Sequence, residues 1–128
     1  MDLLFILGRV LFGGYFTVMG VNHFTKNKML AGYAASKNVP MPVLAVYGSG
    51  MCILLGGLGV LLGIYVWWAL GLLSLFLLLV SLKMHAFWNI SDPQAKMADK
   101  IQFLKNTALL GAVLMMGAIP MPWMMSAM

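Results

Sequence analysis

Two apolar runs joined by a single residue decide the fold: VLAVYGSGMCILLGGLGVLLGI at residues 43–64 and VWWALGLLSLFLLLVSLKMHAFW at residues 66–88. Each run is long enough to cross a hydrocarbon core, which takes about 20 helical residues. A helix is the expected structure for both, because in lipid the backbone polar groups must be satisfied within the segment. Since only Tyr65 separates them, the two helices should lie antiparallel and side by side.

Two further runs of similar character occupy residues 3–24 and 104–123. The chain of 128 residues is 62% hydrophobic and 9% charged, whereas soluble domains contain about 25% charged residues. This composition excludes a water-soluble globular protein. We therefore expect an all-α membrane protein in which residues 1–128 form a single domain, a four-transmembrane-helix bundle.

A short helix lying in the membrane interface is expected between spans one and two. Its apolar residues can share one helical face: Met29, Leu30, Tyr33 and Ala34. Pro40 and Pro42 should end this helix and start span two, because proline disfavours a helical conformation in the residue before it. In the last connection, Asp92 followed by Pro93 is a helix-start signal, so the helix of span four should begin well outside the membrane.

The lysines predict the orientation of the bundle. Four spans place both termini on one side and the two longer connections on the other, and these connections with their flanks hold seven lysines: Lys26, Lys28, Lys37, Lys83, Lys96, Lys100 and Lys105. We call this side the lysine end. Short cytoplasmic loops are enriched in Lys and Arg, so the lysine end should be cytoplasmic and both termini outside. The net charge of +5 then reflects orientation rather than nucleic-acid binding.

Small residues in span two predict how the helices meet. Gly48, Cys52 and Gly56 recur every four residues, and Gly59 and Gly63 continue the pattern. Close packing through small residues drives helix association in lipid. The single cysteine allows no intrachain disulfide, and we interpret it as a small residue of this seam rather than as a redox centre.

Polar residues concentrate near the lysine end. Spans one and three run in the same direction and end on His23 and His85, and further polar residues lie near this level: Asn22, Lys83, Lys105 and Asn106. Three interpretations remain open: anchoring at the interface, a pocket for the carbonyl or anionic end of a lipid-like ligand such as a quinone, and two-histidine ligation of a metal or haem. The last is the least favoured, because no carboxylate or thiolate lies beside the histidines in the sequence.

Arg9 stands apart from this group, in the first span toward the other side of the membrane. It either snorkels outward or points inward, as a clamp on backbone carbonyls or an anion site. No acidic residue lies within a span, which disfavours a proton pump or a cation-coupled carrier. The usual motifs of catalytic sites are absent from the sequence, so we name no catalytic residue.

Several segments together resemble the DoxX family of small four-helix membrane proteins. They are LGRVLFGG at residues 7–14, NHF at 22–24, YAASKNVPMP at 33–42, the glycine-rich span two, the histidine that closes span three, and FLKN at 103–106. The resemblance covers nearly the whole chain in order. Arg9, His85, Lys105 and Asn106 match positions of the family pattern. Many members carry a glutamate near the beginning of span two, where this chain has GSGM at residues 48–51.

The resemblance implies a redox context. The family is named for a membrane subunit of a quinol oxidase or thiosulfate:quinone oxidoreductase, and other members are partners of thiol-redox proteins or assembly factors. We expect an accessory subunit in a prokaryotic cytoplasmic membrane, which binds a quinone or a similar apolar ligand and supports a redox enzyme. The alternative is a non-catalytic scaffold for another membrane protein or for further copies of this chain.

Overall fold

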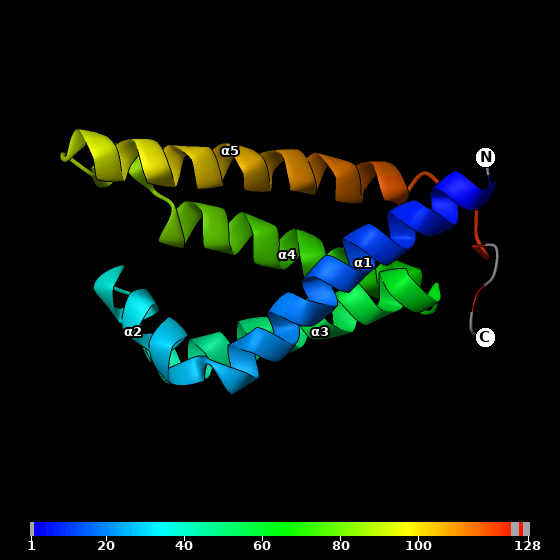
Figure 1. Cartoon of the computed structure of the whole chain (residues 1–128), viewed down its shortest axis with the longest axis horizontal. Helices are drawn as coiled ribbons and strands as arrows, with labels where there is room; N and C mark the ends of the chain where they lie inside the picture. The colour runs from blue at the N-terminus through cyan, green and yellow to red at the C-terminus, as the bar shows by residue number, and fades with distance from the viewer. Residues whose placement is uncertain (1, 124–125, 127–128) are drawn as a thin grey trace.

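A computed structural model describes residues 2–123 and residue 126. The described residues form helices and connecting segments, with no β-strand among them. In chain order the helices are α1 (Asp2–Thr25), α2 (Asn27–Ser36), α3 (Pro42–Leu62), α4 (Val66–Met84), the short 3-10 helix η1 (Phe87–Asn89) and α5 (Pro93–Met116). The predicted all-helical fold is confirmed for this part of the chain (Figure 1).

Three described segments are long and apolar enough to cross a membrane: Asp2–Thr25, Pro42–Leu62 and Val66–Asn89. They correspond to α1, α3 and α4 with η1, and they confirm an integral membrane protein. Helix α5 has 24 residues, a length of about 36 Å. Its first half is polar, however, and carries Lys96, Asp99 and Lys100. The fourth span therefore stays a prediction.

The helix boundaries differ from the predicted spans at two places. Helix α4 ends at Met84, and η1 follows before the chain turns into α5. Helix α5 begins at Pro93, where the Asp92 side chain accepts a hydrogen bond of 2.9 Å from the Ala95 amide. It ends at Met116 rather than continuing to residue 123. The prolines at 120 and 122 account for this early end, because proline cannot continue a helix.

The short helix expected after span one is present as α2. Ala31 and Ala34 are buried with Val46 of α3, whereas Met29 and Tyr33 are exposed. The buried residues of α2 are thus two alanines, which allow it to lie close to α3, and Asn27, whose amide donates to the Val43 carbonyl at 3.3 Å. Its position in the membrane interface stays a prediction.

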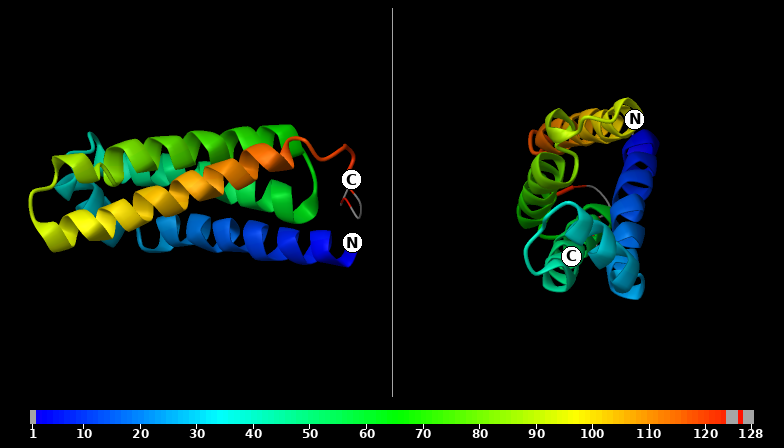
Figure 2. Two further views of the ribbon diagram at one scale, coloured as in Figure 1. Left: turned by 90° about the horizontal axis from the view of Figure 1, so that it is seen from above. Right: turned by 90° about the vertical axis from the view of Figure 1, so that its left-hand side faces the viewer.

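The long helices follow one another around the bundle in the order α1, α3, α4 and α5 (Figure 2, right). Helices α1 and α5 lie closest near the end that holds the N-terminus and diverge toward the end that holds α2 (Figure 1). The buried core runs through the middle of this arrangement and consists of Phe16, Ile53, Val60, Val66, Leu70, Leu73, Leu77, Val113 and Trp123.

Two glycines of the predicted seam pack α3 against α4. A Cβ added at Gly56 would lie 2.6 Å from Leu73 Cγ, and one added at Gly59 would lie 2.4 Å from Ala69 Cβ. These contacts require the absence of a side chain. At Gly48 nothing lies within 4 Å of that position, so this glycine takes no part in the contact.

The other two residues of the predicted seam have different surroundings. Gly63 ends α3 in the left-handed conformation, with φ +70°, which glycine adopts without strain. Cys52 is half-buried and carries a free thiol. The seam is thus a contact inside the bundle at Gly56 and Gly59, and not one continuous stripe.

The closest helix crossing, between α1 and α3, also depends on glycine and was missed in the sequence. A Cβ at Gly13 would lie 2.7 Å from the Leu61 backbone nitrogen and 2.9 Å from the Gly57 carbonyl oxygen. A Cβ at Gly20 would lie 2.7 Å from the backbone of Leu54. The two backbones therefore touch, and neither can yield by rotating a side chain.

Candidate functional site

A buried aspartate at the lysine end joins three helices. Asp99 of α5 is 7% exposed, and its carboxylate forms an ion pair with the Lys37 ammonium, at the end of α2. Its other oxygen lies 3.1 Å from His85 Nδ1, at the end of α4. This cluster of Lys37, His85 and Asp99 ties the first long connection to the last.

The cluster also fixes the charge of Asp99. Burial alone raises the pKa of this carboxyl group, because it disfavours the charged form. Hydrogen bonds from Lys37 and His85, together with the charges of these groups, outweigh burial and lower the pKa below its ordinary value. Asp99 is therefore an anion at neutral pH, and acts as an acceptor for both neighbours.

Both histidines donate a hydrogen bond through Nδ1. The partner of His85 is the Asp99 carboxylate, and the partner of His23 is the Met19 carbonyl oxygen, 2.7 Å away. Carboxylates and carbonyls only accept hydrogen bonds, so Nδ1 carries the proton in both rings.

The two histidines do not share one contact. The His23 ring packs edge-on against Phe76 of α4, with ring centroids 6.1 Å apart, whereas His85 lies at the end of α4. No hydrogen bond or ring contact joins them within the described residues. Of the other residues expected near this level, Asn22 is half-buried and Lys83 is exposed. The two histidines therefore have different partners in the structure.

Two polar side chains near the lysine end are buried, and Ser81 has no partner among the described residues. Ser81 of α4 is 5% exposed, and its Oγ makes no hydrogen bond. Asn106 of α5 is 7% exposed. Polar groups buried in this way are normally satisfied by protein or by water.

Arg9 points into the bundle, at the end opposite the lysines. Its Nε donates to the Val60 carbonyl and its terminal nitrogen to the Leu61 carbonyl, both at 3.2 Å. These carbonyls belong to the last turn of α3, which has no further helical partners for them. The guanidinium also lies against the rings of Phe5 and Trp123, 5.6 and 5.7 Å from their centroids. Of the interpretations left open by the sequence, this is the carbonyl clamp.

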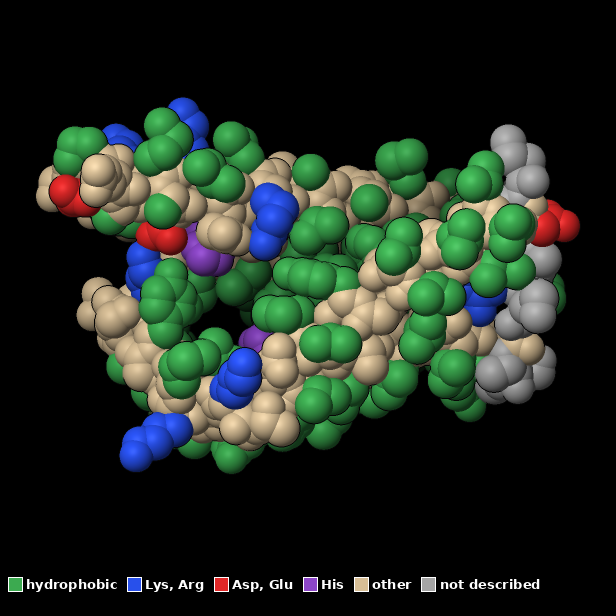
Figure 3. Space-filling view, in the orientation of Figure 1, with side chains coloured by type: hydrophobic (Ala, Val, Ile, Leu, Met, Phe, Trp, Pro, Cys, Tyr) green, Lys and Arg blue, Asp and Glu red, His purple; other side chains and the backbone are tan. Residues whose placement is uncertain are grey.

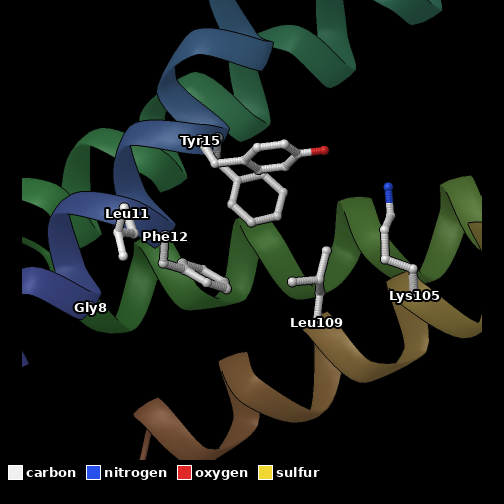
Figure 4. A pocket seen from close by; sticks show the side chains of 7 residues that line it. Gly8, Leu11, Phe12, Tyr15, Lys105 and Leu109 are labelled. Carbon is white, nitrogen blue, oxygen red and sulfur yellow. The ribbon is translucent and has the colours of Figure 1, made fainter.

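A cleft opens between α1 and α5, where these helices diverge. Its volume is about 520 Å³. Most of the lining is apolar, and the residues are Gly8, Leu11, Phe12, Tyr15, Phe16, Lys105 and Leu109. Figure 4 shows that the Tyr15 hydroxyl is directed toward the part of the cleft where the Lys105 side chain extends. The cleft therefore has one apolar end and one end with hydrogen-bond donors.

The space-filling surface shows the same division. Lysine side chains (blue) gather around the end that holds α2, and both histidine side chains (purple) border a hollow at this end (Figure 3). Elsewhere on this face hydrophobic side chains (green) are common, and charged side chains are few (Figure 3). This face thus combines a largely uncharged surface with one polar, hollowed end.

Sequence reasoning missed Tyr15, Lys37 and Asp99 as members of the polar region. A signal for Asp99 was present in the sequence. The helix start at Asp92 fixes the helical phase of α5, and residues 99, 106 and 113 then lie two turns apart on one face. All three of these positions are buried.

Comparison with protein-family models matches residues 4–86 to DoxX. This match spans α1 to the end of α4. The chain belongs to the DoxX family. The matched region contains Arg9, His23 and His85. Three residues of α5 lie beyond it: Asp99, Lys105 and Asn106. Neither a curated protein nor a solved structure matches this DoxX-family chain.

Proposed function

We propose that this DoxX-family protein is a four-span accessory subunit that binds a quinone-like ligand in the cleft between α1 and α5. The observation that carries the proposal is the division of the cleft into an apolar part and an end with two donors, Tyr15 and Lys105. A quinone has the matching division, because its ring oxygens accept hydrogen bonds and its tail is apolar. The redox context comes from the family resemblance.

The chemistry of the cleft fits a carbonyl group better than a cation. The Lys105 ammonium offers three donors and no acceptor, and the Tyr15 hydroxyl can donate as well. The remaining lining is apolar, so ring and tail atoms would be removed from water, which favours binding by about 25 cal/mol per Å². Because the cleft lies between two helices at the surface, the ligand can enter sideways from the lipid.

In this proposal the ligand head is bound by Lys105 and Tyr15, and not by the histidines as the sequence suggested. His85 is held by Asp99 at 3.1 Å and His23 by Met19 at 2.7 Å, whereas Lys105 has no ion-pair partner within the described residues. Asn106, next to Lys105, remains beside the site on the inner face of α5. Asn22 and Lys83 stay predicted ligand-binding residues at the lysine end of the molecule.

The proposal includes an orientation in the membrane. We infer that α5 crosses the membrane with its apolar second half, beside α4, and that its polar first half extends from the lysine end. The lysine end then faces the cytoplasm and both termini face outward, as the excess of lysines favours. Tyr15 and Lys105 would place the ligand head toward the cytoplasmic side.

The test is equilibrium binding of decylubiquinone to the purified protein in lipid nanodiscs, corrected against empty nanodiscs. Lys105→Met should weaken binding roughly 10- to 100-fold, because a charged hydrogen bond is lost. Tyr15→Phe should weaken it about 3- to 10-fold. Lys100→Met is the matched control, since Lys100 is an exposed lysine of the same helix outside the cleft. Wild-type affinity in the Lys105→Met, Tyr15→Phe double variant would reject the site.

The second candidate function is a non-catalytic scaffold for another membrane protein or another copy of this chain. The observation that favours it is at Gly8, which lines the cleft and where an added Cβ would have nothing within 4 Å. A helix of a partner could therefore approach α1 closely at this glycine. Gly8→Leu should then abolish copurification of that partner while leaving the fold intact. Copurification that survives this substitution would exclude the cleft as the scaffold surface.

A further inference from the structure

Two buried polar side chains, Ser81 and Asn106, lie on the inner faces of adjacent, packed helices. Ser81 Oγ, on α4, has no hydrogen-bond partner among the described residues, and Asn106 belongs to α5. Each lies on the same side of its helix as a member of the polar cluster at the lysine end. Ser81 precedes His85 by four residues, or about 6 Å along α4, and Asn106 follows Asp99 by seven residues, or about 10 Å along α5.

These four residues thus form a polar line that runs from the lysine end into the bundle. Its outer part is the cluster of Lys37, His85 and Asp99, whose members satisfy one another. Its inner part is Ser81, whose Oγ has no partner among the described residues, and Asn106, which is 7% exposed. The hollow bordered by the histidines opens at this end of the molecule (Figure 3).

Leaving such groups dry is unfavourable. Burying a hydroxyl or amide without a hydrogen bond lowers the stability of the folded protein by about 1–3 kcal/mol, as judged from mutations. Lipid offers no replacement partner. A site with several polar groups in reach is where buried water is stable, because a water molecule typically makes about three hydrogen bonds. Serine and asparagine can each both donate to water and accept from it.

We propose that the lysine end contains a water-filled inlet, bordered by His85 and Asp99 and reaching Ser81 and Asn106. The inlet admits water and protons from the aqueous phase at the lysine end. Its inner end is at Asn106. The preceding residue, Lys105, lines the cleft between α1 and α5.

The position of the inlet gives it a use that rests on the proposed function. A quinone that receives two electrons from a redox partner protein takes up two protons to become a quinol. The inlet brings water to the turn of α5 that carries Lys105, and so gives these protons a route from the lysine side. Its presence is independent of quinone binding and is tested separately.

The experiment measures the reaction of introduced cysteines with a water-soluble, membrane-impermeant reagent, 2-sulfonatoethyl methanethiosulfonate, in sealed vesicles of known sidedness. Asn106→Cys and the nearly isosteric Ser81→Cys are made in a Cys52→Ala background. Thr107→Cys is the matched control, because Thr107 is exposed at the same depth of α5. Thermal unfolding of each variant against the background protein checks the fold.

An inlet makes Asn106→Cys or Ser81→Cys react from the lysine side at least about tenfold faster than Thr107→Cys, since the reactive thiolate forms in water and not in lipid. The proposal is overturned if both buried cysteines stay unmodified in folded protein but react after denaturation in SDS. It is also overturned if Thr107→Cys reacts as fast as the two buried cysteines, because this part of α5 is then surrounded by water and not by lipid. Loss of quinone binding with intact labelling rejects only the proposed function.

Discussion

The crossing of α1 and α3 allows a sharp test, because neighbouring glycines have opposite surroundings. A Cβ at Gly13 would lie 2.7 Å from Leu61 N, 2.9 Å from Gly57 O and 3.0 Å from Leu61 Cα, whereas at Gly14 nothing lies within 4 Å. All three atoms at Gly13 are backbone atoms. Relief therefore requires the two helices to move apart by about 0.8 Å, to reach an ordinary contact near 3.5 Å.

The expected effects have opposite signs. Gly13→Ala should lower the free energy of unfolding by about 1–3 kcal/mol, the usual range for overpacking, despite its better helix propensity. Gly14→Ala should raise the free energy of unfolding by up to about 1 kcal/mol, because alanine is the better helix former and meets no obstacle. The difference between the variants is then about 1–4 kcal/mol by the same estimates.

The assay is reversible unfolding of the purified protein in mixed micelles, titrated with SDS and followed by tryptophan fluorescence. Far-ultraviolet circular dichroism of each variant before titration checks that the helix content is retained. Equal stability of Gly13→Ala and Gly14→Ala, or greater stability of Gly13→Ala, would refute the backbone contact between α1 and α3.

Three further predictions follow from the buried charges and the orientation. Arg9→Met should lower the free energy of unfolding by about 2–4 kcal/mol, because two carbonyls of α3 lose a charged donor; Arg9→Lys should recover part of this loss in the same SDS titration. Because the folded pKa of Asp99 is depressed, its contribution to stability should be present above the ordinary pKa of about 3.9 and be lost as the pH falls through the lower folded pKa. Asp99→Asn should remove this part of the acid dependence in a titration of stability against pH, and an unchanged profile would contradict the role of the cluster. Finally, a phosphatase reporter at the C-terminus should be active outside the cytoplasm and one in the α4–α5 connection inactive, whereas the reverse pattern would invert the orientation.

Much of the fold was predictable because hydropathy and helix-start signals are local. The lengths of the apolar runs predicted α1, α3 and α4, and Asp92 with Pro93 predicted the start of α5. The early end of α5 and the crossing through Gly13 were missed. The first had a local signal, the prolines at 120 and 122, which the prediction of a span to residue 123 overlooked. The second depends on which face of α1 meets α3.

The candidate site was predictable in composition but not in grouping. The sequence pointed to Arg9, His85, Lys105 and Asn106, yet it paired His85 with His23 and left Asp99 in a flanking segment. In the structure Asp99 holds both His85 and Lys37. Tyr15 had no signal of its own, because a tyrosine in an apolar helix is not distinguished by spacing or charge.

The sequence by itself determined that the chain is a helical membrane protein of the DoxX family, since apolar length and motif order are properties of consecutive residues. Only the tertiary structure decided which polar groups meet. Lys37 and Asp99 are 62 positions apart, and Arg9 and Val60 are 51 apart. Such contacts depend on the rotation and crossing of whole helices, which are set by packing between distant segments. The cleft between α1 and α5 arises in the same way, from two helices that diverge because each packs on a different neighbour.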